Sequence, residues 1–112
     1  MDKKVIIESG KTALGIEFGS TRVKAVLIDE DCGVLASGSY EWENQLLDGY
    51  WTYSLEEVHT ALKTSFKALK ADVKEKYGCD FTTTGAIGIS AMMHGYLAFD
   101  KNGRLLAPFR TW

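Results

Sequence analysis

The chain has 112 residues, of which 46% are apolar and 25% are charged, as is typical of one soluble globular domain rather than a disordered segment. Its net charge of −2 argues against a partner among the nucleic acids, which need a basic surface. The first residues hold the apolar run Val5 to Ile7, too short for a secretory signal or a membrane span, so we expect a cytoplasmic protein without membrane contact. Cys32 and Cys79 lie far apart without a C-x-x-C spacing, and a reduced pair is expected.

The first half of the chain predicts a leader followed by three strands. Residues 1–12 form the leader, in which Val5 to Ile7 have some strand character. Apolar alternation then indicates strands at 13–18, 23–29 and 34–42, with turn residues between them. Because the connections are short, these strands are expected to be antiparallel neighbours.

A long helix is predicted after an aperiodic stretch. Residues 43–53 lack a regular period and read as a loop, whose aromatic rings pack on the sheet or helix, or in which Trp51 or a neighbour walls a pocket. Ser54 and Glu57 have the spacing of a capping box, and apolar residues recur at helical spacing to Tyr77. Gly78 is suited to end a helix over about 54–77, whose lysines fall mostly on the solvated side.

The last third predicts a parallel strand and a hairpin. Residues 85–90 read as a fully buried strand of small residues, parallel to an earlier strand because it follows a helix. A hairpin is expected over about 96–106. Three strands, a helix and a buried strand indicate an α/β fold of the ribonuclease-H-like type. The chain stops at Trp112 without a polar tail, which suggests a piece of a longer protein.

The turn between the first two strands has the residue types of an anion site. Gly19 lets the backbone approach a ligand, while Ser20 and Thr21 offer hydroxyl and N–H groups. Arg22 and Lys24 add positive charge, and Glu17 adds a carboxylate for Mg²⁺ or a bridging water. A phosphate is the anion that fits best. The alternative is an ordinary glycine hairpin in which Glu17 faces water.

A second group of candidate residues follows the predicted parallel strand. Met92, Met93 and His94 lie beyond its carboxyl end, where ligands of open α/β sheets gather. Methionine walls and one imidazole would suit a polyol. The alternative is that His94 has a structural role.

These segments resemble the FGGY carbohydrate kinases. GIEFGSTRVK, residues 15–24, resembles the family's first phosphate motif, G-I-D-x-G-T-T-x-x-K. IGISAMMHG, residues 87–95, is similar to the I-G-I-S-G-Q-M-H-G stretch of xylulokinase-like members, and DKNGRLLAP, residues 100–108, resembles the hairpin that follows, with its tryptophan matched by Trp112. Order and spacing agree over about residues 13–112, which the resemblance identifies as the N-terminal part of the first actin-like domain.

The resemblance implies an ATP-dependent kinase that phosphorylates a sugar, most simply a pentulose such as xylulose, with ATP and Mg²⁺ as cofactors. It implies that Met93 and His94 contact the sugar. At the ATP phosphates and their Mg²⁺ it places Glu17, Gly19, Ser20, Thr21, Arg22 and Lys24. The catalytic base, an aspartate, and the adenosine site are expected outside these residues, so the isolated chain is expected to be inactive. Homo-oligomerisation is left open.

Three departures from the family pattern keep alternatives open. Glu17 replaces the family's aspartate, Ser20 replaces its first threonine, and Ala91-Met92 replaces its glycine-glutamine pair, which leaves the sugar undefined. A ribonuclease-H-like nuclease needs several carboxylates around two metals, and only Glu17 is suitably placed. A chaperone-like ATPase lobe, or a regulator that binds sugar or nucleotide without catalysis, remains an alternative within the superfamily.

Overall fold

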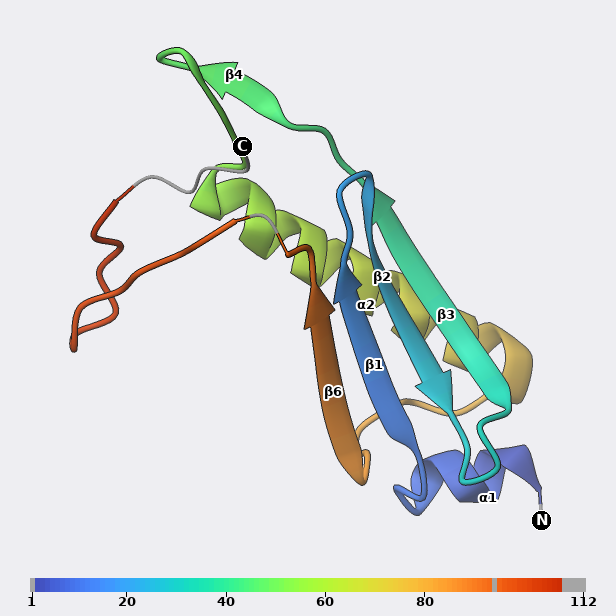
Figure 1. Cartoon of the computed structure of the whole chain (residues 1–112). Coiled ribbons are helices and arrows are strands. Elements are labelled where there is room, and N and C mark those ends of the chain that lie inside the picture. The colour runs from blue at the N-terminus through green and yellow to red at the C-terminus, as the bar shows by residue number, and fades with distance from the viewer. Residues whose placement is uncertain (1, 94, 108–112) are drawn as a thin grey trace.

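A computed structural model describes residues 2–93 and 95–107 and shows a four-stranded mixed sheet with a long helix on one face (Figure 1). The strand order is β3 (Val34–Glu41), β2 (Arg22–Ile28), β1 (Ala13–Phe18) and β6 (Ala86–Ala91). β1 and β2 are antiparallel, as are β2 and β3, whereas β6 runs parallel to β1. The predicted α/β class, the antiparallel meander and the parallel strand are confirmed.

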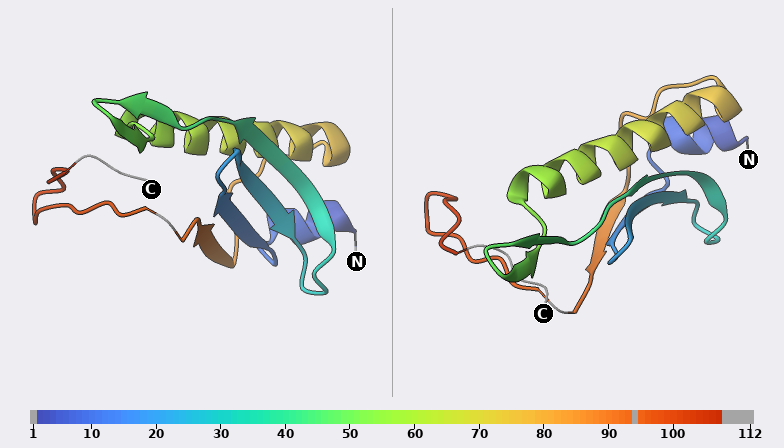
Figure 2. Two further views of the ribbon diagram at one scale, coloured as in Figure 1. Left: turned by 45° about the horizontal axis from the view of Figure 1, so that its top comes forward. Right: turned by 90° about the horizontal axis from the view of Figure 1, so that it is seen from above.

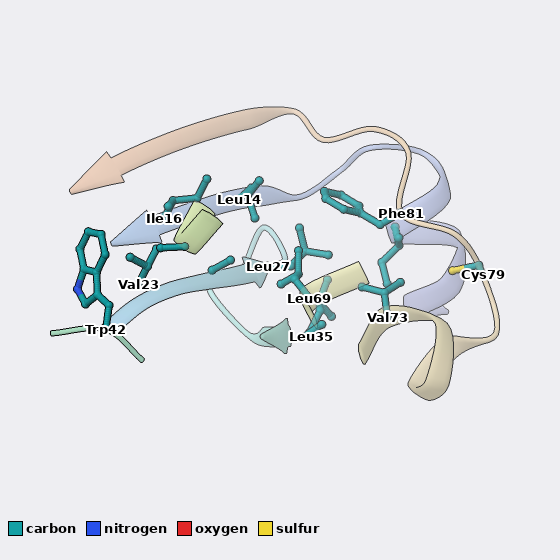
Figure 3. Close-up of a cluster of buried hydrophobic side chains, with 14 of the residues drawn as sticks. Leu14, Ile16, Val23, Leu27, Leu35, Trp42, Leu69, Val73, Cys79 and Phe81 are labelled. Atoms are coloured by element: carbon teal, nitrogen blue, oxygen red, sulfur yellow. The ribbon is translucent and has the colours of Figure 1, made fainter. Parts of the chain in front are cut away.

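Helix α2 (Leu55–Tyr77) covers β3 and β2 and forms the core with them (Figure 2). Alternate residues of the strands turn toward it, among them Leu14 and Ile16 of β1 and Leu27 of β2. Leu69 and Val73 face them from the helix and are completely buried (Figure 3). The alternation of apolar residues in β1 therefore corresponds to its core-facing side.

Both ends of α2 form as the sequence predicts. The hydroxyl oxygen of Ser54 accepts a hydrogen bond from Glu57 N at 3.0 Å, and Gly78 ends the helix in the left-handed region with φ 69°. The Glu57 carboxylate accepts from the Tyr40 hydroxyl at 2.9 Å, so it joins β3 to the helix. This hydrogen bond raises the pKa of Tyr40 above its ordinary value.

The strand character predicted for Val5 to Ile7 is wrong, because the segment forms helix α1 (Lys3–Glu8). Asp2 caps it by accepting from Lys4 N at 3.0 Å, and Ile7 is completely buried. Figure 1 shows α1 beyond the end of the sheet rather than beside an edge strand. A segment in that place has no strand to pair with, and a helix satisfies its own backbone groups.

The stretch predicted as a loop contains a small hairpin of β4 (Gln45–Leu47) and β5 (Tyr50–Thr52). Asp48 and Gly49 join the two strands with φ 52° and 82°. Two left-handed residues in succession make the type I′ turn that Asp-Gly favours in hairpins.

Strand β6 is exposed along its whole length, which corrects the prediction of a fully buried strand. Ile87 is 62% exposed and Ile89 is 69% exposed. The cause is the position of α2, which lies over β2 and β3 and leaves β6, the edge strand on the other side of the described sheet, uncovered. Beyond it, Phe99 and Leu105 form an antiparallel bridge around the Asp100 turn, as the predicted hairpin requires.

Neither helix within residues 2–93 and 95–107 is long and apolar enough to cross a membrane. Cys32 is exposed, Cys79 is buried, and both carry free thiols, as predicted.

Candidate functional site

The two candidate groups of residues lie at one end of the sheet. The turn of residues 19–21 joins β1 to β2 at the end where β6 also finishes. Met92 N, just after β6, donates to Phe18 O at 3.0 Å, immediately before the turn. The turn and the Met92–Met93 stretch are therefore side by side at the carboxyl ends of parallel strands, the usual place for ligands in α/β sheets.

Gly19 is required by the shape of the turn. Its N–H donates to Arg22 O at 2.9 Å, which closes the chain on itself. A Cβ at this position would lie 3.0 Å from Arg22 O and 3.4 Å from Glu17 Oε1. The glycine thus lets the Glu17 carboxylate and the backbone of the turn come together.

The carbonyl groups of the turn are held from one side by two buried aromatic residues. Gly19 O accepts from Trp42 Nε1 at 2.8 Å, Ser20 O accepts from the Tyr53 hydroxyl, and Thr21 O accepts from Trp42 N at 3.1 Å. In a trans peptide the carbonyl and the following N–H point in opposite directions, and the described chain has no cis peptide bond. The N–H groups of Ser20 and Thr21 therefore point away from the two aromatic residues, toward solvent.

Trp42 and Tyr53 support each other as a stacked pair. Their ring centroids are 4.2 Å apart with an interplanar angle of 27°, and Phe18 contacts Trp42 at 6.4 Å. The two side chains are only 5% and 1% exposed, and Figure 3 shows Trp42 at the end of the core near Ile16 and Val23. Burial raises the pKa of the Tyr53 phenol, which keeps it a hydrogen-bond donor.

The charged residues of the turn lie on the side of the sheet that α2 leaves open. Glu17 on β1 is paired in register with Lys24 on β2 and with Ser90 on β6. Residues paired in this way carry their side chains on one face, so the three form a row beside the turn. They line a shallow hollow together with Gly15 and Gly88. Ser20, Thr21 and Arg22 are exposed at its end.

A divalent metal fits this site only together with phosphate oxygens. Within the described ranges no group of three His, Cys, Asp or Glu side chains is arranged to hold an ion. Glu17 supplies one carboxylate, and Ser20 and Thr21 supply hydroxyl groups. Mg²⁺ accepts such a set, because it binds through one or two carboxylates, water and substrate phosphates rather than in an all-protein cage.

The second group of residues is only partly described. Met92 is partly buried against the core, whereas Met93 is 86% exposed beside the turn. His94 lies outside the described residues. The neighbours of Trp51, rather than Trp51 itself, line a separate hollow: its walls include Tyr50, Thr52, Tyr53, Leu105 and Leu106.

Sequence reasoning found the turn but missed the two aromatic residues that hold it. The sequence pattern ends the third predicted strand at Trp42 and includes Tyr53 in the aperiodic stretch of residues 43–53. Neither stands in a periodic pattern, and the contacts depend on how β3 and the segment after β5 return to the β1–β2 turn. A tryptophan and a tyrosine flanking an aperiodic stretch were the only available signal.

Comparison with known proteins gives consistent matches over most of the chain. Residues 12–112 match the FGGY family of carbohydrate kinases, N-terminal domain. A xylulose kinase of Klebsiella pneumoniae is 29% identical over 100 residues, and a glycerol kinase of Thermococcus onnurineus (strain NA1) is 26% identical over 100 residues. Each alignment covers 88% of this chain and 20% of the relative, so the chain spans about a fifth of these curated proteins.

Solved structures give the same fold. The crystal structure of a "xyloylose kinase" from Brucella ovis superimposes with a TM-score of 0.72 at 27% identity, covering 88% of this chain and 20% of that one. A Plasmodium falciparum glycerol kinase, solved with ADP, superimposes with a TM-score of 0.67 at 20% identity, over 90% of this chain and 20% of that one. The second likeness concerns the fold alone.

Proposed function

Since the chain belongs to the FGGY family of carbohydrate kinases, we propose that it supplies the phosphate-binding turn of an ATP-dependent sugar kinase. The observation that carries this proposal is the orientation of the Ser20 and Thr21 N–H groups, which face solvent beside Arg22 and Lys24. Successive outward N–H groups next to positive charge bind phosphate oxygens well.

Each residue of the turn has a role in this proposal. The N–H and hydroxyl groups of Ser20 and Thr21 bind terminal phosphate oxygens, and Arg22 and Lys24 offset their charge. Glu17 holds Mg²⁺ or one of its waters. ATP supplies the phosphoryl group, and the metal offsets charge on the transferring oxygens. No residue of this chain is assigned as the catalytic base, and the isolated 112 residues are predicted to lack turnover.

The sugar site is proposed to begin at Met93, which follows β6 at the same end of the sheet, and to include His94, the next residue in the sequence. A pentulose such as xylulose is favoured, because the Klebsiella pneumoniae and Brucella ovis relatives are named as kinases of that sugar type. Their identities of 29% and 27% support the sugar class more firmly than the individual sugar. We place the reaction in the cytoplasm.

The test uses the full-length kinase, that is, a protein that contains this chain and has the length of its relatives. ADP release is measured with xylulose, ribulose and glycerol as acceptors. We expect sugar-dependent release that falls at least about tenfold in Lys24→Met, because the phosphate loses a charged partner. Lys67→Met, which removes an exposed lysine from α2, is the matched control and should keep the rate. No release with any acceptor would contradict the proposal.

Glu17 favours a second candidate, a regulator that binds ligands without turnover. Its side chain is one methylene longer than the family's aspartate, which displaces the carboxylate that meets the metal. The variant Glu17→Asp decides between the two functions. A protein that binds ADP but gains turnover only as Glu17→Asp would be a regulator, whereas active wild-type protein excludes that alternative.

A further inference from the structure

We propose that Trp42 and Tyr53 are positioning residues that fix the orientation of the Ser20 and Thr21 N–H groups. Neither residue would touch the nucleotide. Both would act through the backbone of the turn. The identity of the bound anion, a nucleotide phosphate, rests on the proposed function, whereas the geometry of the turn does not.

Hydrogen bonds from Trp42 and Tyr53 hold the turn at each of its residues. Three successive carbonyls, those of residues 19, 20 and 21, accept from the same pair of residues. A turn of small, exposed residues would otherwise allow its peptide planes to rotate, since glycine at position 19 restricts rotation least. Anchoring each carbonyl fixes the plane that carries the next N–H group.

The two aromatic residues form a rigid support for the turn. Trp42 and Tyr53 are buried, stacked at 4.2 Å, and lie at opposite ends of the segment that contains β4 and β5. The indole N–H can only donate, and the phenol O–H donates to Ser20 O, so both groups orient carbonyls of the turn. Rigid support of this kind is what keeps a binding group in its productive geometry.

The experiment removes one donor at a time and keeps an aromatic side chain at each position. Tyr53→Phe deletes the hydroxyl that bonds Ser20 O, and Trp42→Phe deletes the indole N–H that bonds Gly19 O. Tyr77→Phe is the matched control, because the Tyr77 hydroxyl donates to a backbone carbonyl, Leu35 O, at 2.7 Å near the opposite end of the sheet. Tyr53→Phe and Tyr77→Phe lose the same kind of bond, so a general loss of stability would appear in both. Trp42→Phe also removes part of a buried ring, so the matched comparison is the one between the two tyrosine variants.

Two measurements on the full-length kinase separate positioning from stability. Calorimetric titration with ADP, and KM for ATP against KM for sugar, should show nucleotide affinity reduced about five- to tenfold in Tyr53→Phe and Trp42→Phe. Sugar KM should stay within about twofold, since the proposed sugar site begins at Met93 and not in the turn itself. Tyr77→Phe should bind ADP as the wild type does. Wild-type affinity in Tyr53→Phe, or an equal loss in Tyr77→Phe, would overturn the proposal.

A third measurement does not need nucleotide. Hydrogen exchange of the Gly19 and Trp42 N–H groups, which donate to Arg22 O and Thr21 O, reports how firmly the turn is held. Exchange should be faster in Tyr53→Phe than in Tyr77→Phe, and equal rates would count against positioning. If the wild-type protein bound no ADP, the proposed function would fail, while the exchange comparison would still decide the role of Tyr53.

Discussion

Gly38 on β3 lies so close to α2 that a Cβ at this position would be 2.4 Å from the carbonyl oxygen of Ser65. The same Cβ would be 2.4 Å from Leu69 N. Here the backbone of the sheet meets the backbone of the helix without a side chain between them. The contact sets how close α2 lies to β3. Nearer the turn, the hydrogen bond from the Tyr40 hydroxyl to Glu57 joins the same two elements.

Replacement of Gly38 by alanine is therefore expected to destabilise the fold. The added methyl group meets backbone atoms, which cannot move aside as a flexible side chain does, so the free energy of unfolding should fall by about 2–3 kcal/mol. Urea unfolding measures the change. The control is Gly88→Ala on β6, where a Cβ would meet nothing within 4 Å. Equal stability of the two variants would contradict the close contact.

Ser54→Ala tests the start of α2. The variant loses the acceptor for Glu57 N at 3.0 Å, and the free energy of unfolding should fall by about 1 kcal/mol. Ser54→Asp restores an acceptor at the same place and adds charge that suits a helix N-terminus, so it should recover most of the loss. The cap would be unimportant if alanine and aspartate gave the same unfolding midpoint.

Local signals predicted the fold where they are complete in the sequence. Ser54 and Gly78 mark the ends of α2 because capping depends on neighbouring residues alone. Asp48-Gly49 was an equally local hairpin signal, but the aromatic residues around it hid the alternation of β4 and β5. Val5 to Ile7 have strand propensity but form part of helix α1, because this segment lies beyond the end of the sheet, where it has no strand to pair with.

Burial and the support of the turn could not be predicted in this way. Ile87 and Ile89 have the composition of a buried strand, yet their exposure depends on which strands α2 covers. Trp42 and Tyr53 reach the turn only through the path of the chain between β3 and α2. The residue types of the site could be read from the sequence, and the peptide orientation that makes it suitable for an anion could not.

The interactions of the Asp29 carboxylate should make the folded protein less stable in acid. The Lys3 ammonium at 2.9 Å, followed by the Gly33 and Asp31 N–H groups, lowers the pKa of the Asp29 carboxyl below its ordinary value. A lowered folded-state pKa stabilises the protein above the unfolded-state pKa of about 3.9, and this stabilisation is lost as the pH falls through the folded-state value. Asp29→Asn should therefore lose less stability than the wild type between about pH 6 and about pH 2.

Urea midpoints measured across this range test the linkage. Lys3→Met is the matched variant, because it removes the ammonium and leaves the Gly33 and Asp31 hydrogen bonds to the carboxylate. The change of the urea midpoint with pH in Lys3→Met should be smaller than in the wild type and larger than in Asp29→Asn. Parallel curves for all three proteins would show that Asp29 does not contribute.

Because strand β6 has an exposed edge, we expect the isolated 112-residue chain to self-associate. Met92 N donates to Phe18 O, so in this parallel ladder the N–H and C=O groups of Ile87 and Ile89 point to the free edge. Ala86–Ala91 has no charge or proline to protect that edge. Sedimentation should show concentration-dependent association that Ile89→Lys reduces. A monomeric wild-type chain over the whole concentration range would contradict this expectation.

The stacking of Trp42 on Tyr53 has a consequence for how this chain can vary. The chain leaves the domain at one ring and re-enters it at the other, 4.2 Å away, so residues 43–52 form an excursion whose two ends are fastened together. Insertions, deletions or a transplanted loop between these rings would leave the entry and exit points unchanged. The segment of residues 43–52 can thus change in evolution while the turn of residues 19–21 and the start of α2 keep their positions.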